Sequence, residues 1–197
     1  MLPDSIQQQL DWAEMRCGVS VPPAQVPEGW TTEWHSTLRP WMASLASAVT
    51  DGALLVIDYA LEASRYYTAR RSDGTLMAYR QGMAGLNPLA QAGEQDLTAH
   101  LCIETLTQVA AHHGWQLQEQ RRQGEALLAL GLANDLHALQ RLPATELAQA
   151  LKRREALLRL VDPAALGDFR WLLYSRGAGA NRLSLATGPD NAGSRPG

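Results

Sequence analysis

Hydrophobic and polar positions along the chain predict helices and strands in alternation. Apolar residues spaced by three and four positions indicate amphipathic helices near 36–50, 101–113 and 145–160, with shorter helices within 2–15 and 124–132. Other runs are typical of strands, at 53–57, 115–119 and 169–174. A helix, a tight turn and a buried strand in succession is the order found in parallel sheets with crossover helices. The pattern therefore predicts an α/β fold.

The strand predicted at 53–57 is the most informative element. Five consecutive apolar residues are followed by Asp58 and Tyr59. A strand buried on both faces shows such a continuous apolar run, so we expect 53–57 in the interior of a sheet, flanked by the helices near 36–50 and 101–113. An acid at the carboxyl end of such a strand lies where open α/β sheets bind ligands. The alternative, a core strand followed by a polar turn, has equal weight.

The connection over residues 60–95 is too long for an ordinary link between a strand and a helix. Long connections in compact domains are usually functional or disordered. This one carries Tyr66, Tyr67, Arg70 and Arg71, and later Tyr79 and Arg80. Tyrosines and arginines in this arrangement can line a polar cleft, or they can belong to an edge hairpin with solvated arginines. The residues alone favour neither interpretation.

Composition narrows the classes of function. The chain has 197 residues, one domain or one domain plus a tail, and a formal charge of −3, which gives no electrostatic footprint for nucleic acid. No apolar run approaches the ~18–20 residues that span a bilayer, and the first residues do not resemble a signal peptide. Cys17 and Cys102 are far apart and are expected to be free thiols in a reducing compartment. We therefore expect a cytoplasmic protein without a nucleic-acid or membrane partner.

The common motifs for phosphate, metal and nucleophilic chemistry are missing. The sequence has no GxGxxG or GxxxxGK[ST] loop, so no phosphate cradle is predicted. It has no CxxC or HExxH, and the adjacent His112 and His113 cannot share one helix face, so no metal site is predicted. It has no GxSxG turn for a hydrolase nucleophile.

Three ordered segments carry a family resemblance. They are Gly-Ala-Leu-Leu-Val-Ile-Asp-Tyr at 52–59, Gly-Thr-Leu-Met-Ala-Tyr-Arg at 74–80 and Asp-Leu-Thr-Ala-His at 96–100. Further matching residues are Pro27 to Trp30, Glu33, Gln123 to Glu125, Leu130 to Leu132 and Leu166 to Phe169. Over about residues 26 to 175 the chain resembles the MidA-like methyltransferases, which include a mitochondrial complex I assembly factor that methylates arginine. The resemblance implies a class I, Rossmann-like fold and S-adenosylmethionine as cofactor.

The resemblance covers only part of that fold. The family's glycine-rich cofactor turn, the acid after its second strand and its Asn-Glu motif are not visible, so cofactor-binding residues stay unassigned. The strand at 53–57 would be the fifth of the family sheet and that at 169–174 the last, with a hairpin insertion and extra helices. We therefore expect an irregular segment at 1–30, a partial methyltransferase domain at 31–176 and a disordered tail at 177–197. Such a chain is a truncated or divergent member, and alone it is expected to bind the cofactor weakly or not at all.

The resemblance also implies candidate site residues. An arginine substrate must be held by carboxylates and must lose a proton. Asp58 and Asp96 are the candidates for that role, with His100 as an orienting group. Tyr59, Tyr79 and Arg80 would shape the substrate cleft. The alternatives are a turn or helix-start role for Asp96 and hairpin packing for Tyr79 and Arg80.

A second class of function stays open from the sequence. Half of a nucleotide-binding sheet has an exposed edge where its missing strands should pair, and such edges recruit another chain. The chain is thus either a methyltransferase whose protein substrate presents an arginine, or a non-catalytic binding or assembly module. In the second case it can self-associate through the exposed sheet edge. If a separate chain or an upstream segment supplies the missing glycine turn, the enzyme interpretation is favoured over the module.

Overall fold

The computed structural model describes residues 2–85 and 87–178 as a mixed α/β protein, which confirms the predicted fold class. The predicted tail at 177–197 lies almost entirely outside the described residues. The chain divides into two compact units, each discontinuous in sequence. The first unit contains the residues up to 49 and 59–115, and the second contains 50–58 and the residues from 116 on. In the described part of the chain, no helix combines the length and the apolar character that crossing a membrane requires.

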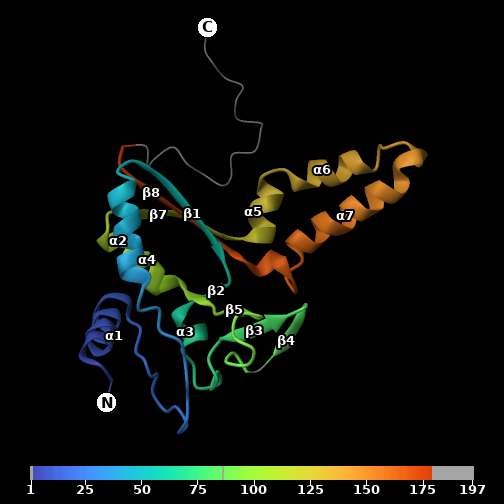
Figure 1. Cartoon of the computed structure of the whole chain (residues 1–197). Helices are drawn as coiled ribbons and strands as arrows, with labels where there is room; N and C mark the ends of the chain where they lie inside the picture. The colour runs from blue at the N-terminus through green and yellow to red at the C-terminus, as the bar shows by residue number, and fades with distance from the viewer. Residues whose placement is uncertain (1, 86, 179–197) are drawn as a thin grey trace. The chain divides into compact units, whose positions relative to one another are not determined.

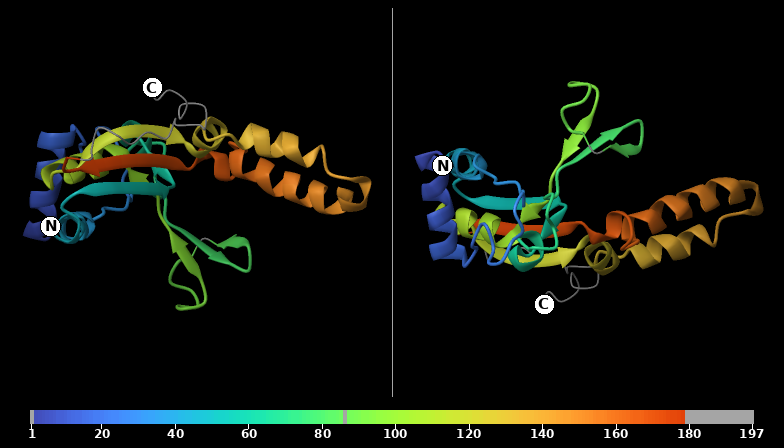
Figure 2. Two further views of the ribbon diagram at one scale, coloured as in Figure 1. Left: turned by 90° about the horizontal axis from the view of Figure 1, so that it is seen from above. Right: turned by 90° about the horizontal axis from the view of Figure 1, so that it is seen from below.

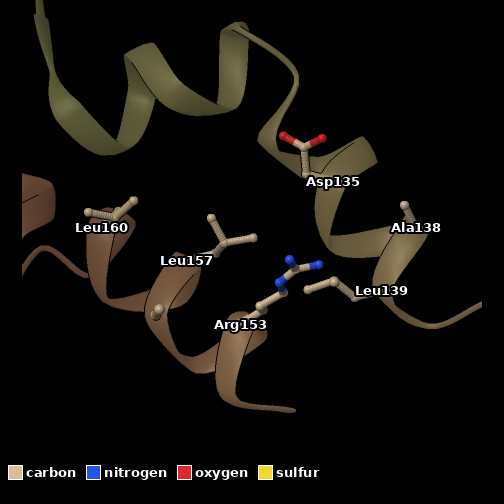
Figure 3. A pocket seen from close by; sticks show the side chains of 7 residues that line it. Asp135, Ala138, Leu139, Arg153, Leu157 and Leu160 are labelled. Carbon is tan, nitrogen blue, oxygen red and sulfur yellow. The ribbon is translucent and has the colours of Figure 1, made fainter. Parts of the chain in front are cut away.

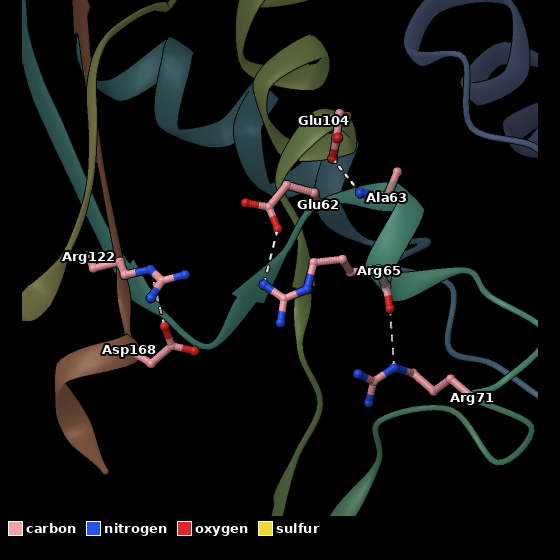
Figure 4. A network of polar contacts seen from close by, with 7 residues as sticks. All are labelled: Glu62, Ala63, Arg65, Arg71, Glu104, Arg122 and Asp168. Atoms are coloured by element: carbon pink, nitrogen blue, oxygen red, sulfur yellow. Dashed lines mark hydrogen bonds and ion pairs between the residues drawn. The ribbon is translucent and has the colours of Figure 1, made fainter. Parts of the chain in front are cut away.

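The first unit is mainly helical, with two small sheets. Its helices are α1 (Asp4–Cys17), α2 (Leu38–Ala48), α3 (Ala63–Tyr66) and α4 (Ile103–His112). Strand β2 (Ala60–Leu61) pairs in parallel with β6 (Leu101–Cys102), and β3 (Met77–Arg80) lies between β4 (Met83–Gly85) and β5 (Asp96–Thr98). Ala13, Tyr66, Tyr67 and Cys102 belong to its buried core cluster. A side-chain oxygen of Glu104 accepts the amide proton of Ala63 at 2.8 Å, where α3 begins (Figure 4).

The second unit is a three-stranded antiparallel sheet joined to helices. Strand β8 (Arg170–Arg176) lies between β1 (Gly52–Asp58) and β7 (Gln116–Arg122). The helices are α5 (Gln123–Ala129), α6 (Leu132–Leu139) and α7 (Leu147–Val161), with short 3-10 turns at η1 (Ala144–Glu146) and η2 (Leu166–Asp168). Helices α6 and α7 lie side by side as an antiparallel hairpin (Figure 2).

The strand predicted at 53–57 exists, but the prediction that it lies in the sheet interior is wrong. Among the described residues, β1 pairs with β8 alone and so forms an edge of the sheet. Leu55 and Ile57 are 41% and 45% exposed. The central strand is β8, whose Leu172 and Tyr174 are fully buried. A continuous apolar run indicates burial but does not say how many neighbouring strands are present.

The segment at 96–100 also differs from the prediction. Asp96 does not begin a helix, because it is the first residue of β5 and pairs in register with Tyr79 of β3. A second short strand, β6, follows before α4 begins at Ile103. The residue that precedes this helix is Cys102, whose side chain makes no capping hydrogen bond. The Asp-Leu-Thr-Ala-His segment therefore begins with a strand rather than with a helix start.

Two glycines allow the second unit to close around Gln123. The Gln123 amide nitrogen donates to the carbonyls of Leu160 and Leu166, at 3.0 Å each, and its oxygen accepts Trp171 Nε1 at 3.2 Å. A Cβ on Gly124 or Gly167 would lie 3.0 or 2.3 Å from the carbonyl oxygen of Val161. This close packing accounts for both glycines without a catalytic role.

An ion pair lies beside this packing. A side-chain nitrogen of Arg122, at the end of β7, is 3.4 Å from a carboxylate oxygen of Asp168 in η2 (Figure 4). Both side chains are more than 40% exposed, so solvent screening leaves the pair a small contribution to stability. The glycines, rather than this ion pair, hold η2 against α5.

Gly167→Ala is expected to destabilise the protein by about 1–3 kcal/mol, because the new methyl group would overlap the backbone of Val161. Gly85→Ala is the matched control, since the nearest atoms to its Cβ lie at 3.8 Å. Urea denaturation followed by circular dichroism measures both variants. Equal midpoints for the two variants would contradict the packing argument.

Candidate functional site

A single carboxylate organises the region around the matched motifs of the first unit. Glu33 accepts hydrogen bonds from the backbone amides of Thr75 and Leu76 at 2.9 and 2.8 Å. It also accepts hydrogen bonds from the Thr75 hydroxyl at 2.9 Å and from the Tyr66 hydroxyl at 3.1 Å. The carboxylate thereby ties the loop before α2 to α3 and to the start of the β3 hairpin.

The network continues from Thr75 to the Asp-Leu-Thr-Ala-His motif. The backbone amide of His100 donates to the Thr75 hydroxyl oxygen at 2.9 Å. The carbonyl oxygen of His100 lies 2.9 Å from His35 Nε2, and this distance requires that nitrogen to carry the proton. Thr75 is 5% exposed, so its hydroxyl links two sequence motifs within a nearly dry environment. The backbone of His100 is therefore fixed from both sides.

Gly74 is required by this arrangement. Its φ of +70° lies in the left-handed region, and a Cβ there would be 2.2 Å from Glu33 Oε1. Any side chain at position 74 would push the Glu33 carboxylate away from the backbone amides that donate hydrogen bonds to it. The first glycine of the Gly-Thr-Leu-Met-Ala-Tyr-Arg motif thus makes room for Glu33.

Burial and hydrogen bonding act in opposite directions on Glu33. Burial alone raises the pKa of its carboxyl group, but the hydrogen bonds from Thr75 and Leu76 together outweigh burial and leave the pKa below its usual value. Burial raises the pKa of the Tyr66 hydroxyl, and the neighbouring Glu33 charge adds to that rise. The site therefore holds an ionised carboxylate against a protonated phenol at neutral pH.

Two of the predicted site residues lie next to each other. Parallel pairing of β2 with β6 places Tyr59 and His100 side by side just before these strands. Their ring centroids are 5.7 Å apart, and the carbonyl of Tyr59 accepts the amide proton of Leu101 at 2.8 Å. Tyr59 is 38% exposed, so the pair presents a phenol and an imidazole at the surface of the first unit.

The other three predicted residues of the first unit lie on its β3 hairpin. Tyr79 and Asp96 are register neighbours on β3 and β5, and both are exposed. Arg80 forms an ion pair with Glu94 at 2.6 Å and also contacts Gln91. Within the described residues, no ion pair involves Asp96, so its carboxylate remains available to a cation. Arg80 instead has an acidic neighbour within the chain.

Asp58 belongs to a different unit from the other candidates. It is the last residue of β1 and belongs to the second unit, whereas the remaining five candidates belong to the first. Its side chain is exposed. The structure thus brings Tyr59 close to His100 and Tyr79 close to Asp96 within the first unit. Asp58, in the second unit, belongs to neither pair.

Sequence reasoning missed the central position of Glu33 and Thr75. Both belong to matched segments, but neither was assigned a role, because an isolated glutamate after a Pro- and Gly-rich stretch resembles a solvated residue. The available signal was the Gly-Thr pair at 74–75, since a turn glycine followed by a threonine offers two free amides and a hydroxyl to an anion. Within the described residues, no group of His, Cys, Asp and Glu could hold a metal ion.

Comparison with known proteins identifies the family. A family model described as "Putative S-adenosyl-L-methionine-dependent methyltransferase" matches residues 4–120, more than half of the chain. The chain belongs to this methyltransferase family. No functionally curated protein matches the sequence.

Solved structures agree with this membership. The methyltransferase-family chain is 25% identical to a Burkholderia thailandensis protein named a "likely methyl transferase" and bound to S-adenosyl-homocysteine, with a TM-score of 0.74. The match covers 89% of this chain and 43% of that one. An uncharacterised protein of the same superfamily and organism is 26% identical, with a TM-score of 0.69. That match covers 77% of this chain and 40% of the other protein. The chain thus spans less than half the length of either protein.

The strand-to-helix junctions after β6 and β7 of this family member do not fit S-adenosylmethionine. A class of site that holds a nucleotide-like cofactor uses a glycine turn between a strand and a helix. Here β6 passes directly into α4 at Cys102, and β7 passes directly into α5 at Arg122. Neither junction has a turn between its strand and its helix, and Gly124, at the second junction, packs against Val161.

Glu33→Gln should destabilise the protein by about 2 kcal/mol at pH 7, because a neutral amide replaces an anion that accepts four hydrogen bonds. The folded-state pKa of Glu33 is lowered, so its contribution is present above pH ~4.5 and is lost as the pH falls through the folded value. Urea titrations between pH 3 and 7 measure this dependence. The difference between wild type and variant should shrink toward low pH, and Glu28→Gln, at an exposed position, should show no difference.

Proposed function

We propose that this chain is the carboxyl-terminal part of a MidA-like, S-adenosylmethionine-dependent methyltransferase that methylates arginine in a protein substrate. The observation that carries the proposal is the likeness to the protein bound to S-adenosyl-homocysteine, over 89% of this chain and less than half of that one. In this proposal the cofactor is held mainly by residues that this chain does not contain. Residues of the first unit face the methyl acceptor.

The sheet of the second unit supports this assignment. Strand β8 has partners on both sides, whereas β1 exposes one edge and two large apolar side chains, Leu55 and Ile57. An apolar strand with an unpaired edge is a template for another strand. A remaining portion of the enzyme can therefore extend the sheet at β1.

The chemistry of the substrate side follows from the exposed acids. A guanidinium is recognised by carboxylates through short, charge-assisted hydrogen bonds, and Asp96 is an exposed carboxylate beside the phenol of Tyr79. Tyr59 and His100 offer a second polar pair on the same unit, with His100 held at its backbone by Thr75. Asp58, which precedes Tyr59, supplies a further acid. Positioning of the nitrogen against the methyl group provides much of the rate in such a transfer.

The chain alone is expected to bind S-adenosylmethionine weakly or not at all. Isothermal titration calorimetry with the purified chain and S-adenosyl-homocysteine tests this expectation. A fusion to the remaining part of the Burkholderia thailandensis protein is the positive control and should restore binding. Micromolar or tighter binding by the unfused chain would refute the partial-enzyme proposal.

Asp96→Asn in the same fusion should lower kcat for methyl transfer by at least tenfold and leave the cofactor dissociation constant unchanged. Asparagine keeps the shape of the side chain and removes the charge that would hold the guanidinium in the transition state. Single-turnover transfer of labelled methyl groups to an arginine-containing protein, beside a cofactor titration, separates the two quantities. Asp73→Asn, at an exposed position before β3, is the control. Unchanged turnover in Asp96→Asn would leave Asp96 as a sheet residue without a substrate role.

The same edge of β1 supports a second candidate function, a non-catalytic assembly module. In that case another chain pairs with β1 and no methyl transfer follows. The fusion distinguishes the two functions. A fusion that binds the cofactor without methyl transfer favours the module, and a fusion with turnover favours the enzyme.

A further inference from the structure

The hairpin of α6 and α7 carries an apolar groove that neither proposed function uses. The groove has a volume of about 530 Å³. Leu139 of α6 and Leu157 and Leu160 of α7 line it, together with two alanines. Figure 3 shows Leu157 and Arg153 pointing from α7 toward α6. Apolar side chains at the surface of a two-helix hairpin indicate a face that another structure covers.

The charges at this groove are self-complementary. Asp135 of α6 and Arg153 of α7 line the same groove from opposite helices, and both are exposed (Figure 3). Among the described residues, no ion pair or hydrogen bond joins the two side chains. The groove thus has an acid on one side and a base on the other. It is complementary to a surface in which the positions of acid and base are exchanged.

We propose that two copies of this chain associate through this groove, with the α6–α7 hairpins facing each other about a two-fold axis that runs along the groove. This operator places α6 of each copy opposite α7 of the other. Asp135 then faces Arg153 of the second copy, and Arg153 faces Asp135 of the second copy. A two-fold interface is necessarily isologous, so one surface must satisfy both sides, as this pair of charges does.

The resulting packing is a four-helix bundle. Because α6 and α7 are antiparallel within one copy, α6 of one copy and α7 of the other are also antiparallel. Neighbouring helices then have opposed dipoles, as in common four-helix bundles. The leucines of the two grooves meet in the middle, and the two ion pairs lie at the margins.

The area sets the expected strength. A helix of the length of α7, 15 residues, is about 22 Å long, and each helix presents a face about 10 Å wide. Helix α6, 8 residues, is only about 12 Å long, so at about 10 Å of width per helix the two helices bury roughly 700 Å² over both copies, which belongs to weak or transient interfaces. The dimer is therefore dependent on protein concentration and forms in the micromolar range or above.

A charge swap tests the interface. Analytical ultracentrifugation of the full chain over a concentration series should show a reversible dimer. Asp135→Arg or Arg153→Asp should each weaken it at least tenfold by placing like charges opposite each other, and the double variant D135R/R153D should restore it. Lys152→Asp is the matched control, because it reverses a charge on the exposed side of α7 beside the groove and should leave the dimer intact.

Three outcomes would overturn the proposal. They are a monomer at every concentration, a double variant no better than the single variants, and a dimer that dissociates on Ile57→Lys but not on Asp135→Arg. The last outcome would assign the association to the edge of β1. Circular dichroism and thermal melting of each variant confirm that the hairpin remains folded, and a folded single variant that still dimerises also counts against the proposal.

Discussion

The ionised carboxylate of Glu33 is the interaction on which the first unit depends. It accepts hydrogen bonds from two backbone amides and two hydroxyls that lie on two separate segments of the chain, at Tyr66 and at Thr75 and Leu76. Through Thr75 it also fixes the backbone of His100, and so the spacing between Tyr59 and His100. A partly buried anion such as Glu33 is costly unless donors surround it, and here the donors lie on the segments that form the candidate site. The stability of the unit and the geometry of the site therefore depend on one side chain.

The sequence predicted the positions of helices and strands better than it predicted which strands pair with each other. The helices and strands with regular spacing exist, among them α2, α7, β1 and β8, because amphipathic stripes and apolar runs are local properties of the chain. The position of β1 at an edge was not predictable in this way, since an apolar run does not reveal how many strands pair with it. The strand conformation of Asp96 could not be predicted from the sequence for a similar reason. Asp96 pairs with Tyr79, and that pairing is set by the register of the hairpin.

Some residues of the candidate site could be predicted from the sequence and others could not. Residues that belong to recognisable motifs, such as Tyr59 and His100, were available to sequence reasoning, although their roles in methyl transfer stay predictions. Glu33 was not, because its importance comes from donors located more than forty positions away. Glycines 74, 124 and 167 show how the motifs can be interpreted physically. Each is a place where a second segment comes too close for a side chain, so these motif positions record packing rather than catalysis.

The pairing of β1 with β8 has a consequence for synthesis of the protein on the ribosome. Ile57 of β1 pairs with Trp171 of β8, which is made more than a hundred residues later. At translation rates of 5–20 residues per second, Ile57 waits roughly 6–23 s for its partner. During that interval the edge of β1 that later pairs with β8 is open, and an open strand edge is a template for pairing with another chain. The order of the strands along the gene thus delays the pairing of β1 until β8 has been synthesised.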